Sequence, residues 1–282
     1  MRQVYSINCR GKLLTTERPL VMGILNVTDD SFFDGGRYCT HDAIAKRCDQ
    51  IIEEGADIID IGAYSSRPGA LDVPAEEEKR RLLEALYIVF GRHPHAIVSI
   101  DTFRADVAHA CIEEGGAHII NDISAYNMDP LMLDTVAKLR VPYILMHMQG
   151  QPSNMQAAPH YEGGVTHDVI EMLGHKVAEL NDNGVADIII DPGFGFGKTL
   201  DDNYELMAAL KQFKEFRRPI LVGISRKSMI YKLIGGAPKD ALNGTTALNM
   251  FALMMGADIL RVHDVKECVE TVKIATELHK YM

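Results

Sequence analysis

Short apolar runs recur along the chain, and polar turns and amphipathic stretches separate them. The clearest run is 188–190, three consecutive isoleucines, a pattern typical of a strand buried on both faces of a parallel sheet. Runs of the same kind predict eight strands in all, near residues 20, 58, 96, 118, 143, 188, 220 and 259. Between them apolar residues recur at helical spacing, as in Val169, Leu173, Val177 and Leu180 or in Leu206, Leu210 and Phe213.

Strands that alternate with helices in this way favour one architecture. Several strands follow a glycine that is typical of a helix end and a short turn, at Gly55, Gly116, Gly184 and Gly256. Eight such units in roughly 260 residues predict a (β/α)8 TIM barrel, with residues 1–282 as a single domain. Residues 3–14 predict a β-hairpin that plugs the bottom of the barrel. A doubly wound sheet is the alternative, because periodicity alone does not show that a sheet closes.

A carboxylate and a glycine-rich loop follow the strand at 188–190. Asp191 stands at the strand end, and the loop 192–198 (PGFGFGK) contains three glycines that are free to adopt positive φ. An acid in this position, before such a loop, is how α/β enzymes present a ligand site. The loop is not a P-loop, because Pro192 stands where that motif needs glycine. Its glycines also lack the spacing of the dinucleotide-binding fingerprint.

Polar residues follow every predicted strand, and in a barrel the strand ends converge on the face where active sites are built. Three of these residues provide acceptors, suited to the parallel N–H groups of an amidine-like ring edge: Asp101, Asn121 and Asp191. Four are cations, suited to a phosphate or a carboxylate: Arg67, Lys227, Arg261 and His263. The sequence thus predicts a flat nitrogen heterocycle that carries an anion, and purine, pyrimidine and pterin remain equally compatible.

Composition narrows the choice of partners and compartment. The net charge of −10 over 282 residues argues against a general nucleic-acid binder, which would present a basic face. Five scattered cysteines without a Cys-x-x-Cys pair indicate a reducing compartment and no structural zinc. The first residues lack the apolar segment of an export signal, and no run approaches the length of a membrane span. We therefore expect a cytoplasmic protein without membrane contact.

Eight segments in order resemble the dihydropteroate synthases, and together they extend over almost the whole chain. They are GILNVTDDSFFDGG (23–36), SSRPGA (65–70), SIDT (99–102), NDIS (121–124), LMHMQGQP (145–152), DPGFGFGK (191–198), GISRKS (223–228) and RVHDV (261–265). The resemblance implies a transferase of folate biosynthesis that condenses 6-hydroxymethyl-7,8-dihydropterin diphosphate with 4-aminobenzoate, giving 7,8-dihydropteroate and diphosphate. It also implies Mg²⁺ as cofactor, small-molecule substrates, a homodimer and a target of sulfonamides.

The resemblance further implies roles for the matched positions. Those around the pterin are Asp101, Asn121, Met146, Asp191, Phe196, Gly223 and Lys227. Those at the diphosphate are Arg67, Arg261 and His263, with Mg²⁺ on Asn26. Those around the 4-aminobenzoate are Phe32, Ser66 and Ser228. The catalytic members are Asp101, Lys227, Arg261 and His263.

The same residues favour a displacement without a covalent enzyme intermediate, because they include no nucleophile–base pair. Diphosphate held by cations is a good leaving group, and its departure leaves a cationic pterin methylene. Asp101 and Asp191 stabilise that charge electrostatically, and the aromatic amine then attacks.

Three positions depart from the family pattern. Asp29 replaces a proline in the first loop, and Tyr64 replaces a glutamate before the second. The third position, Ser66, keeps the hydroxyl of the usual threonine and loses its methyl group. These changes bear on loop dynamics and inhibitor affinity and not on the reaction. Two rivals are the pterin-binding half of a corrinoid-dependent methyltransferase and a non-catalytic pterin-binding paralogue. The anion-binding cations argue against both, and turnover would exclude the second.

Overall fold

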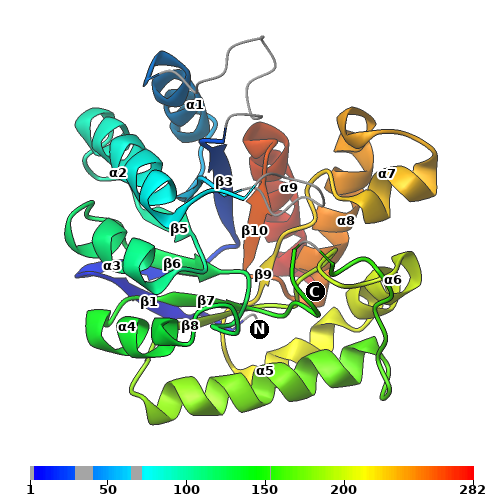
Figure 1. Ribbon diagram of the computed structural model, residues 1–282. Helices are drawn as coiled ribbons and strands as arrows, with labels where there is room; N and C mark the ends of the chain where they lie inside the picture. Colours follow the sequence, from blue (N-terminus) through cyan, green and yellow to red (C-terminus); the bar gives the residue numbers. More distant parts are fainter. Residues whose placement is uncertain (1–2, 29–40, 65–71, 153) are drawn as a thin grey trace.

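Eight parallel strands form a barrel with helices outside it (Figure 1). The computed structural model describes residues 3–28, 41–64, 72–152 and 154–282. The barrel strands are β3 Leu20–Asn26, β4 Ile58–Gly62, β5 Val98–Asp101, β6 Ile119–Asp122, β7 Tyr143–Met146, β8 Ile188–Asp191, β9 Leu221–Val222 and β10 Ile259–Val262. They pair in the order β8-β7-β6-β5-β4-β3-β10-β9, and each starts close to its predicted position.

A bridge joins the two ends of this sheet. Ile190 of β8 pairs in parallel with Ile220, the residue before β9. The Ile190 N–H also donates to the carbonyl oxygen of Pro219 at 2.9 Å. The bridge brings the two edge strands together, so the predicted (β/α)8 TIM barrel is confirmed and the doubly wound sheet is wrong.

Helices cover the outer face of the ring. They are α1 His41–Glu53, α2 Ala75–Arg92, α3 Ala105–Glu113, α4 Leu131–Leu139, α5 Val165–Asp182, α6 Leu200–Ala208, α7 Ser228–Ile234, α8 Leu242–Met255 and α9 Val265–Leu278, with 3-10 turns at Leu210–Phe216, Pro238–Asp240 and His279–Tyr281. Ala209 leaves the helical conformation, with φ −90° and ψ 3°. Leu206, Leu210 and Phe213 therefore lie on two elements, and the single helix that their spacing predicted is wrong. Within the described ranges, no helix has the length and apolar character needed to cross a membrane.

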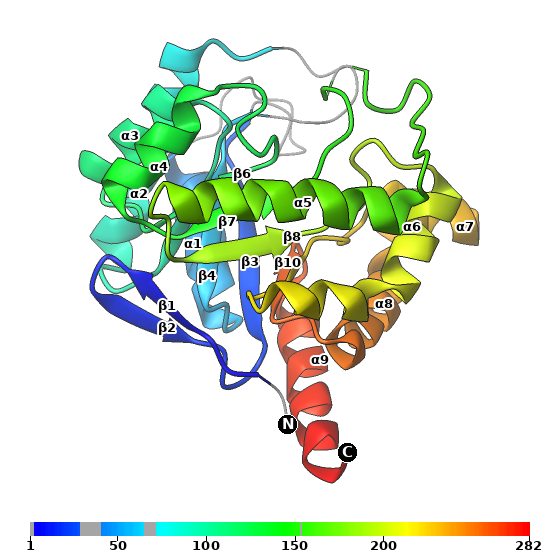
Figure 2. The ribbon, with the colours of Figure 1, turned by 90° about the horizontal axis from the view of Figure 1, so that it is seen from below.

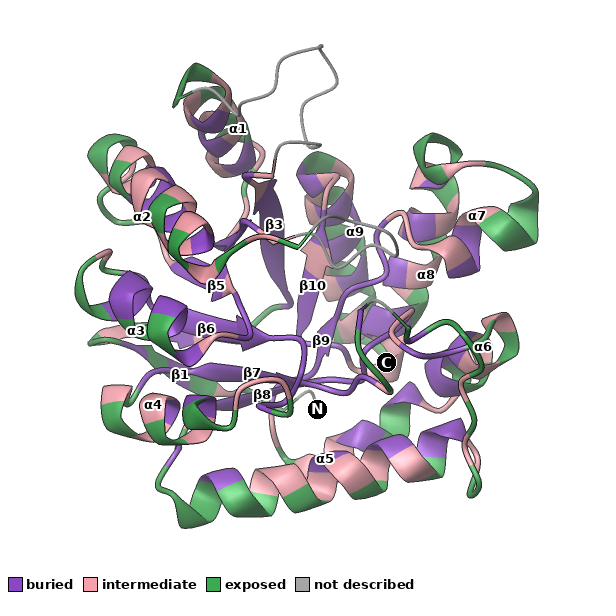
Figure 3. Cartoon of the chain, in the orientation of Figure 1, coloured by how far each residue is buried: buried purple, intermediate pink, exposed green. Residues whose placement is uncertain are grey.

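Side chains alternate between the two faces of each strand, and the outward ones build the main core. In β4, Ile59 and Ile61 belong to this core, together with helix residues such as Ile51 of α1 and Leu86 of α2. Figure 3 shows the buried positions along the strands and on the helix faces that turn towards them. The alternation leaves Asp60, between the two isoleucines, to point into the barrel.

The N-terminal hairpin seals the lower barrel. Its strands, β1 Ser6–Cys9 and β2 Lys12–Thr15, pair antiparallel. Ile7, Cys9 and Leu14 pack against inward-facing residues of the barrel strands: Leu20, Met22, Ile58, Ile119, Ile144, Ile189, Leu221 and Ile259. Figure 2 shows the hairpin, in dark blue, beside β3 and β4. The predicted plug is confirmed, and it leaves the carboxyl ends of the strands for polar chemistry.

Leu14→Ala should lower the free energy of unfolding by about 2–5 kcal/mol, because it leaves a cavity under the barrel. Leu14 is 9% exposed, whereas its neighbour Leu13 is 66% exposed. Leu13→Ala removes the same atoms and should change stability by less than about 0.5 kcal/mol. Urea unfolding of both variants measures the difference. Equal losses would contradict the plugging role of the hairpin.

Candidate active site

Polar side chains line up at the carboxyl ends of neighbouring strands. The strand register places Asn26 of β3 beside Gly62 of β4, and Gly62 beside Asp101 of β5. Asp101 in turn pairs with Asn121 of β6. Gly62 has no side chain, so Asn26 and Asp101 face each other across it: a β-carbon there would lie 3.4 Å from Asp101 Cβ and 3.7 Å from Asn26 Oδ1. The structure thus brings three of the predicted site residues together.

Arg261 of β10 crosses the barrel mouth to two carboxylates. Its Nε donates to Asp60 Oδ2 at 2.6 Å, and its NH2 group donates to Asp101 Oδ2 at 2.7 Å. Asp60 is fully buried and also accepts from Asn121 Nδ2 at 3.2 Å. Gly223, after β9, lies against Arg261, and a β-carbon there would be 3.7 Å from Arg261 Cβ. These contacts place Arg261 in the predicted site.

Sequence reasoning missed the part that Asp60 takes in this network. It stands among the strand-end polar residues, but no role in the site was assigned to it. The signal that indicates it is its place two residues before Gly62, which puts it on the inward face of β4. Its partner Arg261 lies 201 residues away, so no local pattern shows the pairing.

Burial and charge shift the titration of this network. Burial raises the pKa of Asp101 to about 7, although the charge of Arg261 opposes the rise and Asp60 adds to it. Burial also works against the charge of Arg261, but Asp60 and Asp101 outweigh it and raise the pKa of Arg261 above its ordinary value. The guanidinium therefore stays charged, while Asp101 titrates near neutral pH.

A second acid–base pair lies on the other side of the mouth. Asp191 of β8 is paired in register with Met146 of β7, and its Oδ1 accepts the Gly193 N–H at 2.8 Å. Burial raises the pKa of Asp191, and the charge of Lys227 opposes this. Burial lowers the pKa of Lys227 to about 8, with Asp191 opposing. Each group thus helps the other to keep its charge in a buried setting.

The glycine-rich loop after β8 surrounds Lys227. The Lys227 ammonium donates to the carbonyl oxygen of Phe194 and lies 4.6 Å from the centre of the Phe196 ring. Phe196 also packs against an apolar cluster at this mouth, which includes Met146, Phe103, Ile123, Met148 and Met155. The predicted neighbours Met146, Asp191, Phe196 and Lys227 are therefore close together. Ser228 follows directly as the first residue of α7.

Lys198 fixes the backbone of the glycine-rich loop 192–198 through hydrogen bonds of its buried ammonium group. Its ammonium donates to His147 Nδ1 at 2.9 Å, to Gly193 O at 2.8 Å and to Phe196 O at 3.1 Å. Lys198 is 2% exposed, and burial lowers its pKa to about 7. The sequence placed this lysine at the end of a ligand-binding loop, but the structure uses it to fix the backbone of that loop.

The loops after β9 and β10 are tied to each other. The Ser225 hydroxyl accepts the backbone N–H of His263 at 3.1 Å and lies 3.2 Å from His263 Nδ1. Arg226 donates from Nε to Asp264 at 2.9 Å, and Arg47 of α1 donates to the carbonyl oxygen of His263 at 2.6 Å. These bonds hold the loop that carries Lys227 against the end of β10, which carries Arg261.

A family model described as pterin binding enzyme matches residues 22–263. The dihydropteroate synthase of Escherichia coli (strain K12) is 43% identical over 267 residues, which cover 94% of this chain and 93% of that protein. The chain belongs to the dihydropteroate synthase family.

Solved dihydropteroate synthases share the fold over nearly their whole length. The Yersinia pestis enzyme with a sulfonamide drug complex has a TM-score of 0.92 and 40% identity, covering 99% of this chain and 100% of that one. The Xanthomonas albilineans enzyme with 4-aminobenzoic acid has a TM-score of 0.90 and 40% identity, covering 98% and 99%. The same enzyme in complex with 7,8-dihydropteroate has a TM-score of 0.87 and 38% identity, covering 98% and 99%.

Several residues assigned from the dihydropteroate synthase resemblance lie outside the described residues. Phe32 falls in 29–40, as does Asp29, and Ser66 and Arg67 fall in 65–71. Their assignments stay predictions. Tyr64, the other departure from the family pattern, packs edge-on against Phe103 at 5.1 Å between ring centres.

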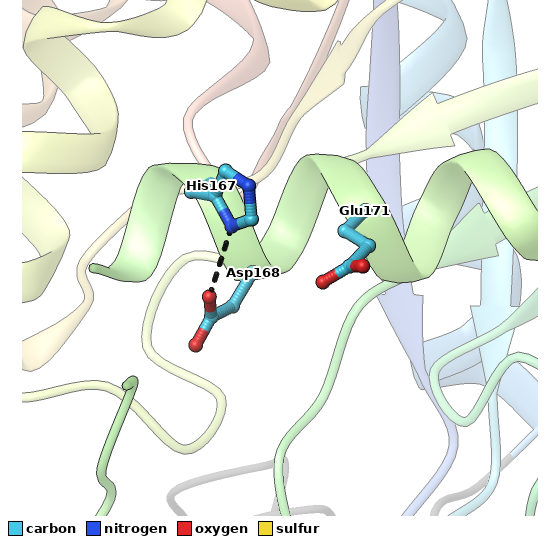
Figure 4. A group of neighbouring side chains, drawn as sticks. All are labelled: His167, Asp168 and Glu171. Atoms are coloured by element: carbon cyan, nitrogen blue, oxygen red, sulfur yellow. Dashed lines mark hydrogen bonds and ion pairs between the residues drawn. The ribbon is translucent and has the colours of Figure 1, made fainter. Parts of the chain in front are cut away.

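A possible metal-binding group in the described ranges stands apart from the strand ends. His167, Asp168 and Glu171 project from α5, where His167 Nδ1 lies 3.2 Å from Asp168 Oδ1 (Figure 4). Asp168 also accepts the Gly163 N–H at 3.2 Å, so it already serves the start of the helix. His167 and Glu171 are exposed, and exposed groups of this kind are common without a metal. For a dihydropteroate synthase, Asn26 at the mouth remains the predicted metal ligand.

Gly193→Ala should destabilise the protein strongly, because Gly193 has φ +73° and a β-carbon would lie 1.8 Å from the carbonyl oxygen of His147. Gly184 is a matched control: it has φ +80°, yet a β-carbon there would meet no described atom within 4 Å. Both variants incur about 1–2 kcal/mol for the left-handed backbone. Gly193→Ala should lose about 1–3 kcal/mol more through the forced contact. Chemical unfolding compares them, and equal losses would contradict the close approach of the loop to β7.

Proposed function

We propose that this chain condenses 6-hydroxymethyl-7,8-dihydropterin diphosphate with 4-aminobenzoate to give 7,8-dihydropteroate and diphosphate. The observation that carries the proposal is a set of acceptors and cations that lie buried or half-buried at one barrel mouth: Asp101, Asn121, Asp191, Lys227 and Arg261. The relatives support it, since one dihydropteroate synthase was solved with 4-aminobenzoic acid and with 7,8-dihydropteroate.

Asp191 suits the pterin edge. One of its oxygens accepts the Gly193 N–H, and a carboxylate retains further lone pairs for two parallel donors. The N3–H and 2-amino groups of a pterin form such a pair, and bonds of this kind to a charged acceptor are strong. Lys227 lies on the same side and donates to an acceptor such as the ring carbonyl. Phe196 and Met146 provide apolar surface beside the ring.

Charge stabilisation is sufficient for the reaction. The bond between the pterin methylene carbon and the diphosphate oxygen breaks, and both electrons leave with diphosphate. Asp101 and Asp191 face the cationic pterin that results, in a site where burial strengthens electrostatic interactions. The amine of 4-aminobenzoate then forms the new carbon–nitrogen bond and releases its proton to solvent. Arg261 and His263 lie on the side assigned to the departing anion.

Mg²⁺ fits the donor set at the end of β3. The side-chain oxygen of Asn26 lies at the mouth beside Asp101, and Mg²⁺ prefers oxygen ligands and commonly keeps waters and substrate phosphates. When bound, the ion neutralises part of the diphosphate charge and makes it a better leaving group. Asn26 would hold the ion, and Arg261 and His263 would orient the diphosphate.

A homodimer and a cytoplasmic setting are part of the proposal. Helix α8 contacts both α7 and α9, and exposed apolar side chains occur on all three helices: Leu233, Ile234, Phe251, Ile274 and Leu278. Surfaces of this kind mark interaction sites when they form a patch. The free thiols of the described ranges, Cys9, Cys48, Cys111 and Cys268, support a reducing compartment.

Diphosphate release tests the function. The purified protein is mixed with Mg²⁺, the pterin diphosphate and 4-aminobenzoate, and both diphosphate and 7,8-dihydropteroate are measured. Release in equal amounts, only when both substrates are present, is the expected result. Tight pterin binding without release would instead favour the non-catalytic paralogue.

Affinity for 7,8-dihydropterin should be greatest between about pH 7 and 8. The pKa of Asp101 is raised to about 7, so its charged form is lost as the pH falls through that value. The pKa of Lys227 is lowered to about 8, so its charge is lost as the pH rises through that value. Calorimetry across this range measures the loss of affinity on the acidic side and on the basic side. 7,8-Dihydropterin carries no phosphate, so the ligand adds no phosphate titration of its own. Asp101→Asn should reduce the loss of affinity on the acidic side and leave the part due to Asp191, whose pKa burial also raises. An acidic side that is unchanged in Asp101→Asn would contradict the assignment.

Mg²⁺ should bind weakly to the free protein and more tightly once diphosphate is present, because Asn26 provides one oxygen only. Asn26→Ala should remove this enhancement. His167→Ala, at the exposed group on α5, is the control and should leave it unchanged. Calorimetric titration of Mg²⁺ with and without diphosphate measures both. A tight site in the free protein, or one lost in His167→Ala, would place the metal elsewhere.

Phe251→Asp should shift the protein towards a monomer, because Phe251 on α8 is 39% exposed among the apolar side chains of the proposed dimer face. Sedimentation equilibrium measures the mass of both forms. Tyr87→Asp on α2, where Tyr87 is 84% exposed, is the control and should remain a dimer. A wild-type protein that stays monomeric would contradict the proposed homodimer.

A further inference from the structure

Asp60 is a buried carboxylate at the mouth to which the proposed reaction assigns no role. It belongs to β4, is fully buried, and points into the barrel beside Ser99 of β5 in the strand register. Arg261 Nε donates to its Oδ2 at 2.6 Å, and Asn121 Nδ2 lies 3.2 Å from Oδ2 and 3.4 Å from Oδ1. One side chain thus contacts both a member of the cation group and a member of the acceptor group.

The contact with Arg261 fixes the plane of the guanidinium. Asp60 accepts from Nε and Asp101 accepts from NH2, so two carboxylates fix the guanidinium. With Asp101 alone, the guanidinium would be free to turn about one ion pair. With both, it presents its remaining N–H donors in one direction, as the recognition of an anion or of a ring face requires.

The contact with Asn121 fixes which end of the amide faces the ligand. A carboxylate paired with a guanidinium only accepts hydrogen bonds, so the Asn121 group that faces Asp60 must be the amino group. The reversed amide would set its oxygen against the carboxylate and lose that bond. Asp60 therefore directs the Asn121 oxygen away from itself, towards the mouth that Asp101 and Asp191 share.

We propose that Asp60 is a positioning residue that orients Arg261 and the amide of Asn121 together. It does not touch substrate, and it acts through these two side chains. Ring recognition and anion recognition then depend on the same buried carboxylate. The proposal rests on the proposed function, because the ligands that test it are the two halves of the pterin substrate.

A buried ion pair is by itself weak evidence for a role in stability or in binding, because desolvation offsets its attraction. The test therefore needs a control with the same chemistry elsewhere. Asp57, on the same chain segment but before β4, pairs with Arg18 at 2.6 Å and 3.0 Å and accepts the Val21 N–H at 2.8 Å. Asp57→Asn removes another aspartate–arginine pair, a more exposed one at the opposite end of the barrel.

The experiment compares wild type, Asp60→Asn and Asp57→Asn by calorimetry with two separate ligands, 7,8-dihydropterin and inorganic diphosphate with Mg²⁺. Asp60→Asn should weaken both by about tenfold or more, because the neutral amide loses the charge that pairs with Arg261 and sets an amino group against that of Asn121. Asp57→Asn should leave both affinities within about twofold of wild type, whatever it does to the melting temperature. Thermal melts of all three proteins separate lost binding from lost folding.

A double variant shows whether Asp60 acts through Asn121. If it does, Asp60→Asn should weaken 7,8-dihydropterin binding far less in an Asn121→Ala background than in wild type. Three outcomes would each overturn the positioning role. The losses of affinity caused by Asp60→Asn and Asn121→Ala could add in the double variant, Asp60→Asn could bind both ligands as wild type does, or Asp57→Asn could lose as much affinity as Asp60→Asn. Wild-type protein that binds both ligands but releases no diphosphate when both substrates are present would overturn the proposed function alone. The ratios of the affinities of wild type and variants would still decide the role of Asp60.

Discussion

The mouth of the barrel depends on one guanidinium group. Arg261 bonds to Asp60, which is fully buried, at 2.6 Å and to Asp101, which is half-buried, at 2.7 Å. Isolated buried charges are costly, and neighbouring carboxylates repel each other. Arg261 compensates this pair, and Lys227 has the same effect on Asp191. These cations offset the negative charge that the acids bring to one mouth.

The barrel explains why these charges meet at the carboxyl ends of its strands. Alternation along each strand sends one set of side chains outward to the helices and the other set into the barrel. The lower inward positions are apolar and pack against the hairpin, and the polar inward residues lie above them at the carboxyl ends of the strands. Lys198 then fixes the glycine-rich loop, which presents Phe194 and Phe196 to Lys227. In the proposed reaction, recognition and catalysis follow from position and charge.

The sequence predicted the strands, the barrel and the plug because apolar periodicity is a strong local signal. It also predicted that Asp101, Asn121 and Asp191 meet, because parallel strands bring their carboxyl ends to one face. The pairing of Asp60 with Arg261 has no local signal, since it depends on how the ring closes. The sequence DPGFGFGK (191–198) does not show whether the Lys198 ammonium binds a ligand or bonds to His147 within the protein. The interruption of α6 at Ala209 was missed because apolar spacing continues across it.

The measurement that tests the central claim most directly is the affinity of Asp191→Asn for 7,8-dihydropterin. The account places the charged acceptor of the ring edge at Asp191, so the variant sets an amide donor against ring donors. An unpaired buried polar group costs about 1–3 kcal/mol, and calorimetry should show a loss of that size at least. The unfolding midpoint must show that the variant is folded. Unchanged affinity in a folded Asp191→Asn protein would contradict the account of this mouth as a pterin site.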